Sequence, residues 1–347
     1  MKKRILCLLL MIVVILSIAS CNQSSQTESI EESKTSDENS NTVSNAEKTN
    51  VNVLTIAGPT GMGMAKMMDL NKSEGTRNNY VFNITSAPTD VMTAIVTGEA
   101  DIAACPINLA AKIYSKTEGN VQVLAINTLG VLYVVTNGTE INSFEDLNGK
   151  TIVTSGKGAT PEYAMKYLFE AFGIEATLDF VDDFSTAANM VASGEIEIAL
   201  LAEPSVSSAR AKNNELVVAL NITEIWRESG KTGKIPEIEL AQGCVIVRKE
   251  YAEQNPAAVK KFLADYKESV DFMTSEQNLE AAALLCETYQ IVPKAAIAKM
   301  ALPRCNIVCI VDDEMKAIAE GNLKVFHQYD PSSIGGKMPD EAFYYVS

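Results

Sequence analysis

The residue types that most often carry catalysis are scarce in this chain and lack their usual partners. Its 347 residues contain one histidine, His327, and no serine or cysteine stands in a recognisable pairing with it. A nucleophile–base mechanism is therefore not predicted. Carboxylates remain an alternative, because Glu203 and Asp182 each follow a predicted strand. The sequence favours binding over catalysis, and we predict neither a catalytic residue nor a cofactor.

The cysteines indicate burial more than metal binding. Beyond Cys7 and Cys21 five remain, and four of these stand among apolar residues, as small buried side chains do. Cys305 and Cys309 could form a disulfide or half of a metal site, but the only further ligand is His327. We predict no metal site, and the redox state of this pair stays open. The odd number argues against a disulfide framework. The five are Cys105, Cys244, Cys286, Cys305 and Cys309.

Two short turns are the strongest candidates for ligand contact. Residues 58–63 lack the lysine–hydroxyl ending of a Walker loop and are a poor dinucleotide fingerprint, but N–H groups at a helix start attract anions. The second turn, residues 155–160, adds the charge of Lys157, whose alternative role is that of a solvated surface lysine. Glu203 would instead select a cation or an amine. The charge of the ligand therefore stays open.

Large apolar side chains offer a second kind of contact. Trp226 and Tyr163 are candidates for stacking on a ligand, although Tyr163 lies in a predicted helix, where core packing is the alternative. Four methionines follow helical spacing, which indicates core packing more than the lining of a cofactor site. They are Met62, Met64, Met67 and Met68.

The first 21 residues have the pattern of an exported and lipidated protein. Basic residues near the start precede the apolar run 5–19, which ends in small residues. Cys21 follows as in a bacterial lipobox, where the cysteine is acylated, palmitate being one expected chain. A transmembrane anchor is the alternative, but the run is shorter than the roughly 20 residues that span a bilayer. We expect residues 1–20 to be a signal peptide and the protein to be lipid-anchored on the extracytoplasmic face of the cell membrane.

Composition divides the remaining chain into a stalk and a folded body. Residues 21–50 are almost entirely polar, cannot bury enough surface to fold, and are predicted to be a disordered stalk. Residues 51–347 are too many for one ordinary core and suit two lobes. The formal net charge of −15 argues against nucleic acid as a partner and against direct contact with an anionic membrane face.

Short apolar segments alternate with helical ones up to residue 248, after which the pattern is helical. This alternation predicts βαβ units and a mostly parallel sheet, and hence an α/β fold. Strands are expected at 51–57, 80–85, 101–105, 121–126, 131–136, 150–154, 177–181, 196–201, 216–220 and 241–248. Helices are expected at 62–70, 89–97, 108–115, 161–172, 185–192, 204–212, 256–273, 279–289, 294–301 and 313–328.

Residues 91–103 are echoed 96 positions later by residues 187–199. Each segment is an apolar helix ended by a glycine, Gly98 or Gly194, and followed by an acidic residue and a buried strand. Chance is the alternative, because helix–glycine–strand units are common. We predict two lobes built on one plan, with the loops at their strand carboxyl ends around one shared ligand crevice.

Four segments resemble the solute-binding proteins of ABC importers for nitrate, sulfonate and taurine, a group that includes binders of thiamine-pyrimidine precursors. They are residues 98–103, 144–152, 193–199 together with Glu203 and Pro204, and 255–262. The resemblance covers nearly all of residues 51–347 and implies a type 2 periplasmic-binding-protein fold. It places lobe 1 at 51–133 and 243–347 and lobe 2 at 134–242, with the strands near 131–136 and 241–248 as the hinge.

The same resemblance implies ligand contacts at Thr60, Gly61, Ser86, Asn108, Gly158, Ala159, Thr160 and Glu203, and Lys157 joins them because of its charge. The chain departs from the family by offering few aromatics in these loops, which weakens the pyrimidine interpretation. It also offers no arginine there, so a sulfonate would depend on helix dipoles and Lys157.

The function that follows from the resemblance is a monomer that binds a small-molecule solute and delivers it to ABC permease subunits, without enzymatic activity. One alternative is a binding-only sensor lobe for a membrane kinase. A second, less favoured, is an extracytoplasmic enzyme on the same fold. The identity of the solute stays open.

Overall fold

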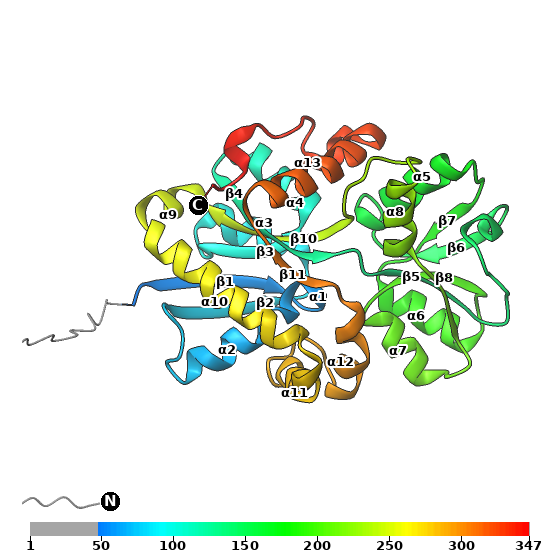
Figure 1. The fold of residues 1–347 in the computed structure, drawn as a ribbon, viewed down its shortest axis with the longest axis horizontal. Helices are drawn as coiled ribbons and strands as arrows, with labels where there is room; N and C mark the ends of the chain where they lie inside the picture. Colours follow the sequence, from blue (N-terminus) through cyan, green and yellow to red (C-terminus); the bar gives the residue numbers. More distant parts are fainter. Residues whose placement is uncertain (1–47, 347) are drawn as a thin grey trace, which may run out of the picture. The chain divides into compact units, whose positions relative to one another are not determined.

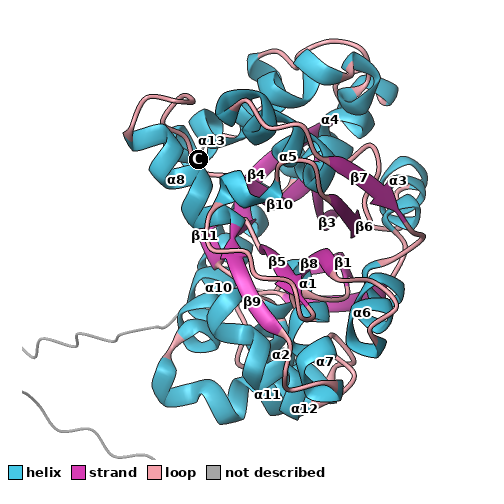
Figure 2. Cartoon of the chain, turned by 90° about the vertical axis from the view of Figure 1, so that its right-hand side faces the viewer, coloured by secondary structure: helices cyan, strands magenta, loops and turns pink. Residues whose placement is uncertain are grey.

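The computed structural model describes residues 48–346. The expected signal peptide, Cys21 and nearly all of the expected stalk therefore lie outside the described residues. Two β-sheets run through the described part of the chain (Figure 1). Helices lie around the strands, as the cyan and magenta ribbons of Figure 2 show.

Sheet A has six strands in the order β11-β4-β10-β3-β1-β2. Its strands are β1 (Asn50–Ile56), β2 (Asn79–Thr85), β3 (Ile102–Pro106), β4 (Val121–Leu129), β10 (Ala241–Arg248) and β11 (Ile307–Ile310). Sheet B has five strands in the order β7-β6-β8-β5-β9. They are β5 (Leu132–Thr136), β6 (Thr151–Thr154), β7 (Thr177–Phe180), β8 (Ile198–Ala202) and β9 (Val217–Asn221).

The helices between the strands follow the expected order closely. Those before β10 are α1 (Pro59–Met62), α2 (Ala65–Lys72), α3 (Pro88–Thr97), α4 (Ile107–Lys116), α5 (Thr160–Phe172), α6 (Phe184–Ser193), α7 (Ser205–Lys212) and α8 (Ile222–Lys231). Those after it are α9 (Lys249–Gln254), α10 (Pro256–Thr274), α11 (Leu279–Thr288), α12 (Ala295–Ala301) and α13 (Asp312–Tyr329). Short 3₁₀ turns η3 (Leu302–Arg304) and η4 (Pro331–Ile334) follow α12 and α13.

The two sheets share one plan, as the sequence echo predicts. β1 pairs in parallel with β2 and β3, and β6 pairs in parallel with β7 and β8. Helices α3 and α6 have bounds 96 residues apart and end at Gly98 and Gly194, both in the left-handed conformation that glycine adopts without strain. In each sheet an antiparallel strand lies next to these parallel strands, β10 beside β3 in sheet A and β5 beside β8 in sheet B.

Those antiparallel strands interrupt sheets that are otherwise mostly parallel, as expected, since four of the six strands of sheet A and four of the five of sheet B run in one direction. β10 runs antiparallel to both β3 and β4, and β5 to both β8 and β9. A parallel neighbour needs a crossover connection within its own sheet. β5 and β10 instead enter directly from the other sheet, because the chain passes from β4 to β5 and returns at Leu240 to β10.

Local corrections concern four segments. The single helix expected at 62–70 is two helices, α1 and α2, that break at Gly63, where a Cβ atom would lie 2.7 Å from the Tyr266 hydroxyl oxygen. Helices α8 and α9 and strand β11 have no counterpart among the predicted elements. Strand β11 spans only Ile307–Ile310 and pairs with β4 across a bulge, so its sequence carries no periodic signal.

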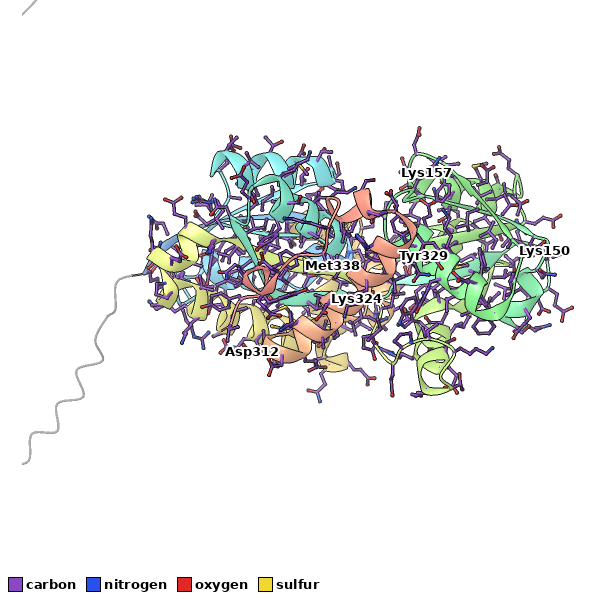
Figure 3. All side chains as sticks on the ribbon, turned by 90° about the horizontal axis from the view of Figure 1, so that it is seen from above. Lys150, Lys157, Asp312, Lys324, Tyr329 and Met338 are labelled. Carbon is purple, nitrogen blue, oxygen red and sulfur yellow. The ribbon has the colours of Figure 1, made fainter. Side chains whose placement is uncertain are left out.

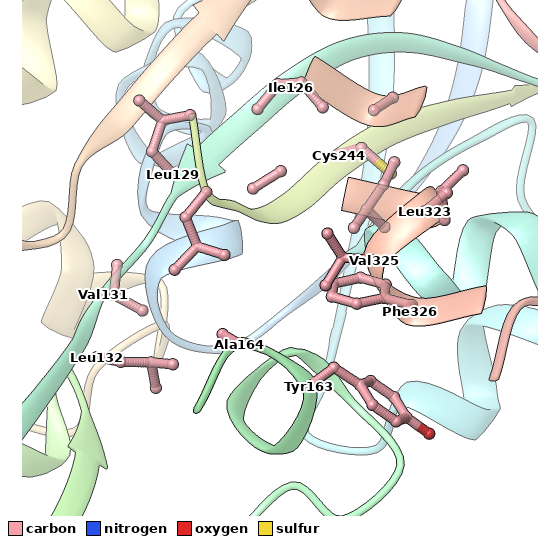
Figure 4. Close-up of a cluster of buried hydrophobic side chains, with 14 of the residues drawn as sticks. Ile126, Leu129, Val131, Leu132, Tyr163, Ala164, Cys244, Leu323, Val325 and Phe326 are labelled. Atoms are coloured by element: carbon pink, nitrogen blue, oxygen red, sulfur yellow. The ribbon is translucent and has the colours of Figure 1, made fainter. Parts of the chain in front are cut away.

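The apolar core confirms the packing interpretation of the methionines. Met62, Met64, Met67 and Met68 are all buried in one cluster with helix α10. A larger cluster includes Val134 of sheet B and Cys244 of sheet A, so apolar packing continues from one sheet to the other. Figure 4 shows part of it, where Tyr163 of α5 lies beside Phe326 of α13, with ring centroids 5.5 Å apart.

Candidate functional site

The candidate site lies at the carboxyl ends of the parallel strands. There β1 leads into α1 and β3 into α4 on sheet A, while β6 leads toward α5 and β8 toward α7 on sheet B. The free N–H groups of these helix starts therefore lie at the same edge of each sheet as the strand ends. Five of the nine predicted ligand residues lie at the starts of α1, α4 and α5, namely Thr60, Gly61, Asn108, Ala159 and Thr160.

Asn108 connects the loops of the two sheets. Its amide nitrogen lies 3.3 Å from the carbonyl oxygen of Gly158 and 3.5 Å from that of Ser333. Because both neighbours are acceptors, the amide must present its N–H groups to them. The other end of the amide, Oδ1, is buried without a protein partner. Asn108 Oδ1 is thus a buried hydrogen-bond acceptor without a donor, an arrangement that costs free energy.

The start of α5 presents a second unpaired group two residues from that contact. Thr160 is fully buried and its hydroxyl oxygen has no protein partner. The turn is held by Glu162, which accepts a hydrogen bond of 2.7 Å from the Gly158 amide and an ion-pair contact of 2.5 Å from Lys166. Burial raises the pKa of Glu162, but the Lys166 and Gly158 N–H groups outweigh it, so the pKa is lowered overall.

Thr60 and Gly61 sit where α1 is pressed against sheet A. The Thr60 carbonyl accepts a 3.0 Å hydrogen bond from Asn127 of β4. Gly243 of β10 faces Asn127 and Thr60. A Cβ atom on Gly243 would lie 2.6 Å from Asn127 Oδ1 and 3.3 Å from the Thr60 hydroxyl oxygen. A Cβ atom on Gly61 would lie 2.6 Å from the Ile56 carbonyl oxygen. These close approaches fix the Thr60 loop against strands that belong to the far part of the sequence.

Glu203 differs from its expected role as a group open to a ligand. It is 1 % exposed, and its carboxylate accepts from Arg304 Nε at 2.8 Å and from the Ser207 amide at 3.1 Å. Burial raises the pKa of Glu203, and Arg304 and Ser207 oppose the rise without reversing it. The carboxylate is therefore engaged by the protein itself, and a cation-selecting role for it has no support in these contacts.

Arg304 is the main residue that sequence reasoning missed. It belongs to η3, more than 100 positions from Glu203, and its carbonyl also accepts a 3.0 Å hydrogen bond from Tyr133 of β5. The predicted ligand loops themselves contain no arginine, but the fold brings Arg304 beside Glu203. No local pattern in residues 302–304 marks such a long-range partner.

The other predicted contacts make no hydrogen bond or ion pair with Asn108 within residues 48–346. Ser86 and Lys157 are exposed, and Figure 3 labels Lys157. The Lys157 Nζ atom lies 6.0 Å from the centre of the Phe180 ring. Trp226 is fully buried, and its indole N–H donates to the Ile238 carbonyl at 2.8 Å. Tyr163 is 2 % exposed and packs on Phe326. Both aromatics are therefore core residues, and the stacking interpretation is wrong.

Two polar residues inside strands were not predicted and resemble Asn108 in lacking a partner. Thr55 of β1 is fully buried with its hydroxyl unpaired, 3.3 Å from where a Gly61 Cβ would stand. Gln242 of β10, next to Gly243, has an unpaired Oε1. The sequence does show a polar residue in an apolar strand at each position. That pattern does not distinguish a residue that contacts a ligand from one that makes an internal hydrogen bond.

Across 48–346 no group of three or more His, Cys, Asp or Glu side chains is arranged to hold a metal ion. Among the same residues no helix combines the length and apolarity needed to cross a bilayer.

Comparison with known proteins places the chain in context. Residues 69–287 match a family model described as ABC transporter, phosphonate, periplasmic substrate-binding protein. No curated protein matches the chain.

Solved structures with low sequence identity share the fold. One is an ABC transporter protein from Parabacteroides distasonis, 20% identical, with a TM-score of 0.72 over 86% of this chain and 99% of that one. A second is the periplasmic aliphatic sulphonate binding protein SsuA from Escherichia coli, 15% identical, with a TM-score of 0.66 over 86% and 92%. A third is the nitrate-binding protein NrtA from Synechocystis, 14% identical, with a TM-score of 0.57 over 82% of each chain.

Proposed function

The chain belongs to the periplasmic substrate-binding protein family of phosphonate ABC transporters, and from this premise we propose that it is a lipid-anchored receptor that captures one small polar solute. It is a solute-binding protein of an ABC importer. The proposed additions are the lipid anchor at Cys21, the monomeric state, and a role limited to binding, without chemistry on the solute.

The observation that carries the proposal is the contact of Asn108 with Gly158. It joins the start of α4 to the turn before α5, so loops from sheet A and sheet B meet there. Beside the contact stand two buried atoms without partners, Asn108 Oδ1 and Thr160 Oγ1. A bound solute that donates to Asn108 and bonds to Thr160 would remove the free-energy cost of leaving them unpaired.

The proposed motion is closure of two lobes about their connecting strands. We assign lobe 1 to residues 51–133 and 243–347 and lobe 2 to 134–242, as expected from the sequence. The positions of the passages support this assignment, because β4 gives way to β5 between Leu129 and Leu132 and the chain returns at Ala241. A ligand held by both lobes stabilises the closed arrangement by its differential contacts.

The proposed site consists of the helix-start residues and excludes three earlier candidates from direct contact. Thr60, Gly61, Asn108, Gly158, Ala159 and Thr160 are retained. Glu203 is assigned to holding Arg304, and Ser86 and Lys157 are assigned to the rim because both are exposed. None of these six retained residues bears a formal charge, and the nearby Arg304 is already paired with Glu203. Backbone N–H groups and hydroxyls would therefore provide most of the recognition.

A thermal-denaturation screen tests the proposal. Purified protein is heated with alkylphosphonates, alkylsulfonates, nitrate, amino acids and aminopyrimidines, each at millimolar concentration. A solute present at 100 times its Kd adds about 2.7 kcal/mol to the free energy of unfolding, which raises Tm measurably. A rise with one class, saturating at one molecule per chain in calorimetry, is expected.

The variant Asn108→Ala then tests where the solute binds. Loss of one buried hydrogen bond should weaken binding about tenfold or more. Asn213→Ala is the matched control, because Asn213 also donates its side-chain amide to a backbone carbonyl, that of Ala192 at 3.1 Å, but stands after α7. Equal affinity of wild type and Asn108→Ala would contradict the assigned site.

A further inference from the structure

Two cysteines face each other across the strand pair that carries the candidate site. Cys105 on β3 and Cys244 on β10 are direct partners in the antiparallel register. They are about 140 residues apart in the sequence. Cys105 stands three positions before Asn108, and Cys244 follows Gly243, the glycine that faces Thr60. The pair therefore lies directly beneath two of the proposed ligand loops.

The register brings the Cα atoms of the two cysteines within reach of a disulfide. Directly opposed residues in antiparallel strands have Cα atoms about 4.5 or 5.5 Å apart, depending on which of the two pair types they form. A disulfide needs Cα atoms roughly 4.4–6.8 Å apart. Both pair types fall in that range. The Arg248 amide donates to the Asp101 carbonyl at 2.9 Å, so alternation along the register makes Cys105 and Cys244 a hydrogen-bonded pair, the wider type. The bond therefore also requires a small approach of the two strands, which brings the Cβ atoms within disulfide range.

The side chains also lie on one face and close together. Opposed residues of an antiparallel pair project to the same side of the sheet, and both cysteines belong to the same apolar cluster and are fully buried. Figure 4 shows Cys244 in that cluster, beside Leu323 and Val325 of α13. Burial and then a hydrogen bond with the Cys105 thiol raise the pKa of Cys244 well above its usual range.

We propose that Cys105 and Cys244 are a site of covalent modification, joined by a cross-strand disulfide in the exported protein. The structure holds the two as free thiols. Family membership places the protein outside the cytoplasm, where disulfides form and persist. Because both thiols are fully buried once the protein has folded, the exchange takes place during folding after export, and the oxidant is a disulfide of the thiol-exchange class. Its S–S bond is broken and takes two electrons and two protons from the pair, yielding two donor thiols and one new Cys105–Cys244 bond.

This proposal is independent of the solute and of the lipid anchor, and needs only the extracytoplasmic location. Its test is peptide mapping of the mature chain isolated from an exporting host, from whichever extracytoplasmic fraction contains it. Thiols are blocked with N-ethylmaleimide in denaturant before any reduction, and the digest is examined by mass spectrometry. We expect one peptide pair joined through Cys105 and Cys244, with Cys286, Cys305 and Cys309 alkylated.

Two results would overturn it. One is alkylation of both Cys105 and Cys244 before reduction, and the other is a bond that joins a different pair, such as Cys286 with Cys305. A second measurement compares Tm of protein isolated with and without reductant. A link that closes a loop of this length should raise Tm by roughly 5–10 °C. The gain should vanish in Cys244→Ala and persist in the control Cys286→Ala, which removes another buried thiol. Because the peptide map uses the wild-type chain, it stands even if Cys244→Ala fails to fold.

Discussion

Glu162 is the side chain that most directly holds the candidate ligand turn. Its carboxylate accepts from the Gly158 amide, and Gly158 in turn receives the Asn108 amide. The residue is 8 % exposed, so these bonds are made away from bulk water. Charge-assisted bonds of this kind are roughly twice as strong as neutral ones. The order of the turn therefore depends on the ionisation of one carboxyl group.

We predict that Glu162→Gln destabilises the protein by about 1–2 kcal/mol at neutral pH. The folded-state pKa lies below the ordinary value of 4.5. The unfolded chain therefore binds the proton first, and the stabilisation is present above pH 4.5 and lost as pH falls through the folded pKa. Urea denaturation from pH 7 to pH 3 should show the gap between wild type and variant narrowing on the acid side. The exposed Glu175→Gln serves as control, and a gap that widens toward acid would refute the assignment.

The Arg304–Glu203 pair should behave as a buried ion pair whose partners depend on each other. The glutamate side chain is 0 % exposed and the arginine side chain 29 %. Arg304→Met leaves a buried carboxylate unpaired, and we predict a loss of about 3–5 kcal/mol in urea denaturation. The double variant Arg304→Met with Glu203→Gln should lose less than the two single effects added together.

The matched control is Arg227→Met. Arg227 pairs with Glu239 at 2.7 Å, but both side chains are about one-third exposed, so the loss should stay under about 1 kcal/mol. If Arg304→Met costs no more than this control, the pair does not hold η3 to the end of β8.

Residue-level prediction from the sequence succeeded where chemistry is local and failed where it is long-range. The helix-start positions of Thr60, Asn108 and Thr160 follow from turn and cap patterns that a short window reveals. Glu203 was placed correctly at the end of a strand, but its partner comes from residue 304, and no spacing rule reaches that far. The prediction for Trp226 was wrong because the sequence around a tryptophan does not reveal whether its indole packs in the core or contacts a ligand.

Helix α1 shows how tightly the elements around the site are packed. It spans only Pro59–Met62 and bears Thr60 and Gly61. A Cβ atom on Gly61 would stand 2.6 Å from the Ile56 carbonyl oxygen, closer than real Cβ atoms approach backbone. The helix can therefore rest on the end of β1 only because residue 61 has no side chain.

We predict that Gly61→Ala lowers the free energy of unfolding by about 1–3 kcal/mol, because α1 must move away from β1. Affinity for the solute should fall with it, since Thr60 moves too. Thermal denaturation provides the first measurement and calorimetry the second. Gly75→Ala, where the added methyl would meet only ordinary contacts with Leu70, should change stability by less than about 0.5 kcal/mol. An unchanged Gly61→Ala protein would show that α1 is not constrained in this way.

Elements with a strong period were predictable and those defined by pairing were not. Helices α3 and α6 and the strands after them repeat at an interval of 96 residues, so the pattern identified both and their shared plan. Strand β11 is short and has its place in sheet A only through β4. The direction of β5 and β10 depends on which sheet the chain enters, and a list of strands does not contain that information.

The whole molecule is held together by contacts that sequence alone did not reveal. Besides the two passages between the sheets, α12 contacts α7 and α13 contacts α5. Tyr163 of α5 donates to Asp330, which follows α13, at 3.2 Å. The last 50 residues therefore connect the surroundings of both sheets. Closure on a solute must preserve or remake these contacts together with the Asn108–Gly158 bond.

The central claim, that two lobes close on one solute, is tested most directly by the distance between them. Spin labels at Thr89→Cys on α3 and Ser185→Cys on α6, both exposed, report it by pulsed electron resonance. Cys309, the one described cysteine that is not fully buried, is replaced by alanine to avoid a third label. With the solute that gives the largest thermal shift, the account predicts a shorter and narrower distance distribution than without it. An identical distribution in both samples, at a solute concentration that saturates binding, would contradict it.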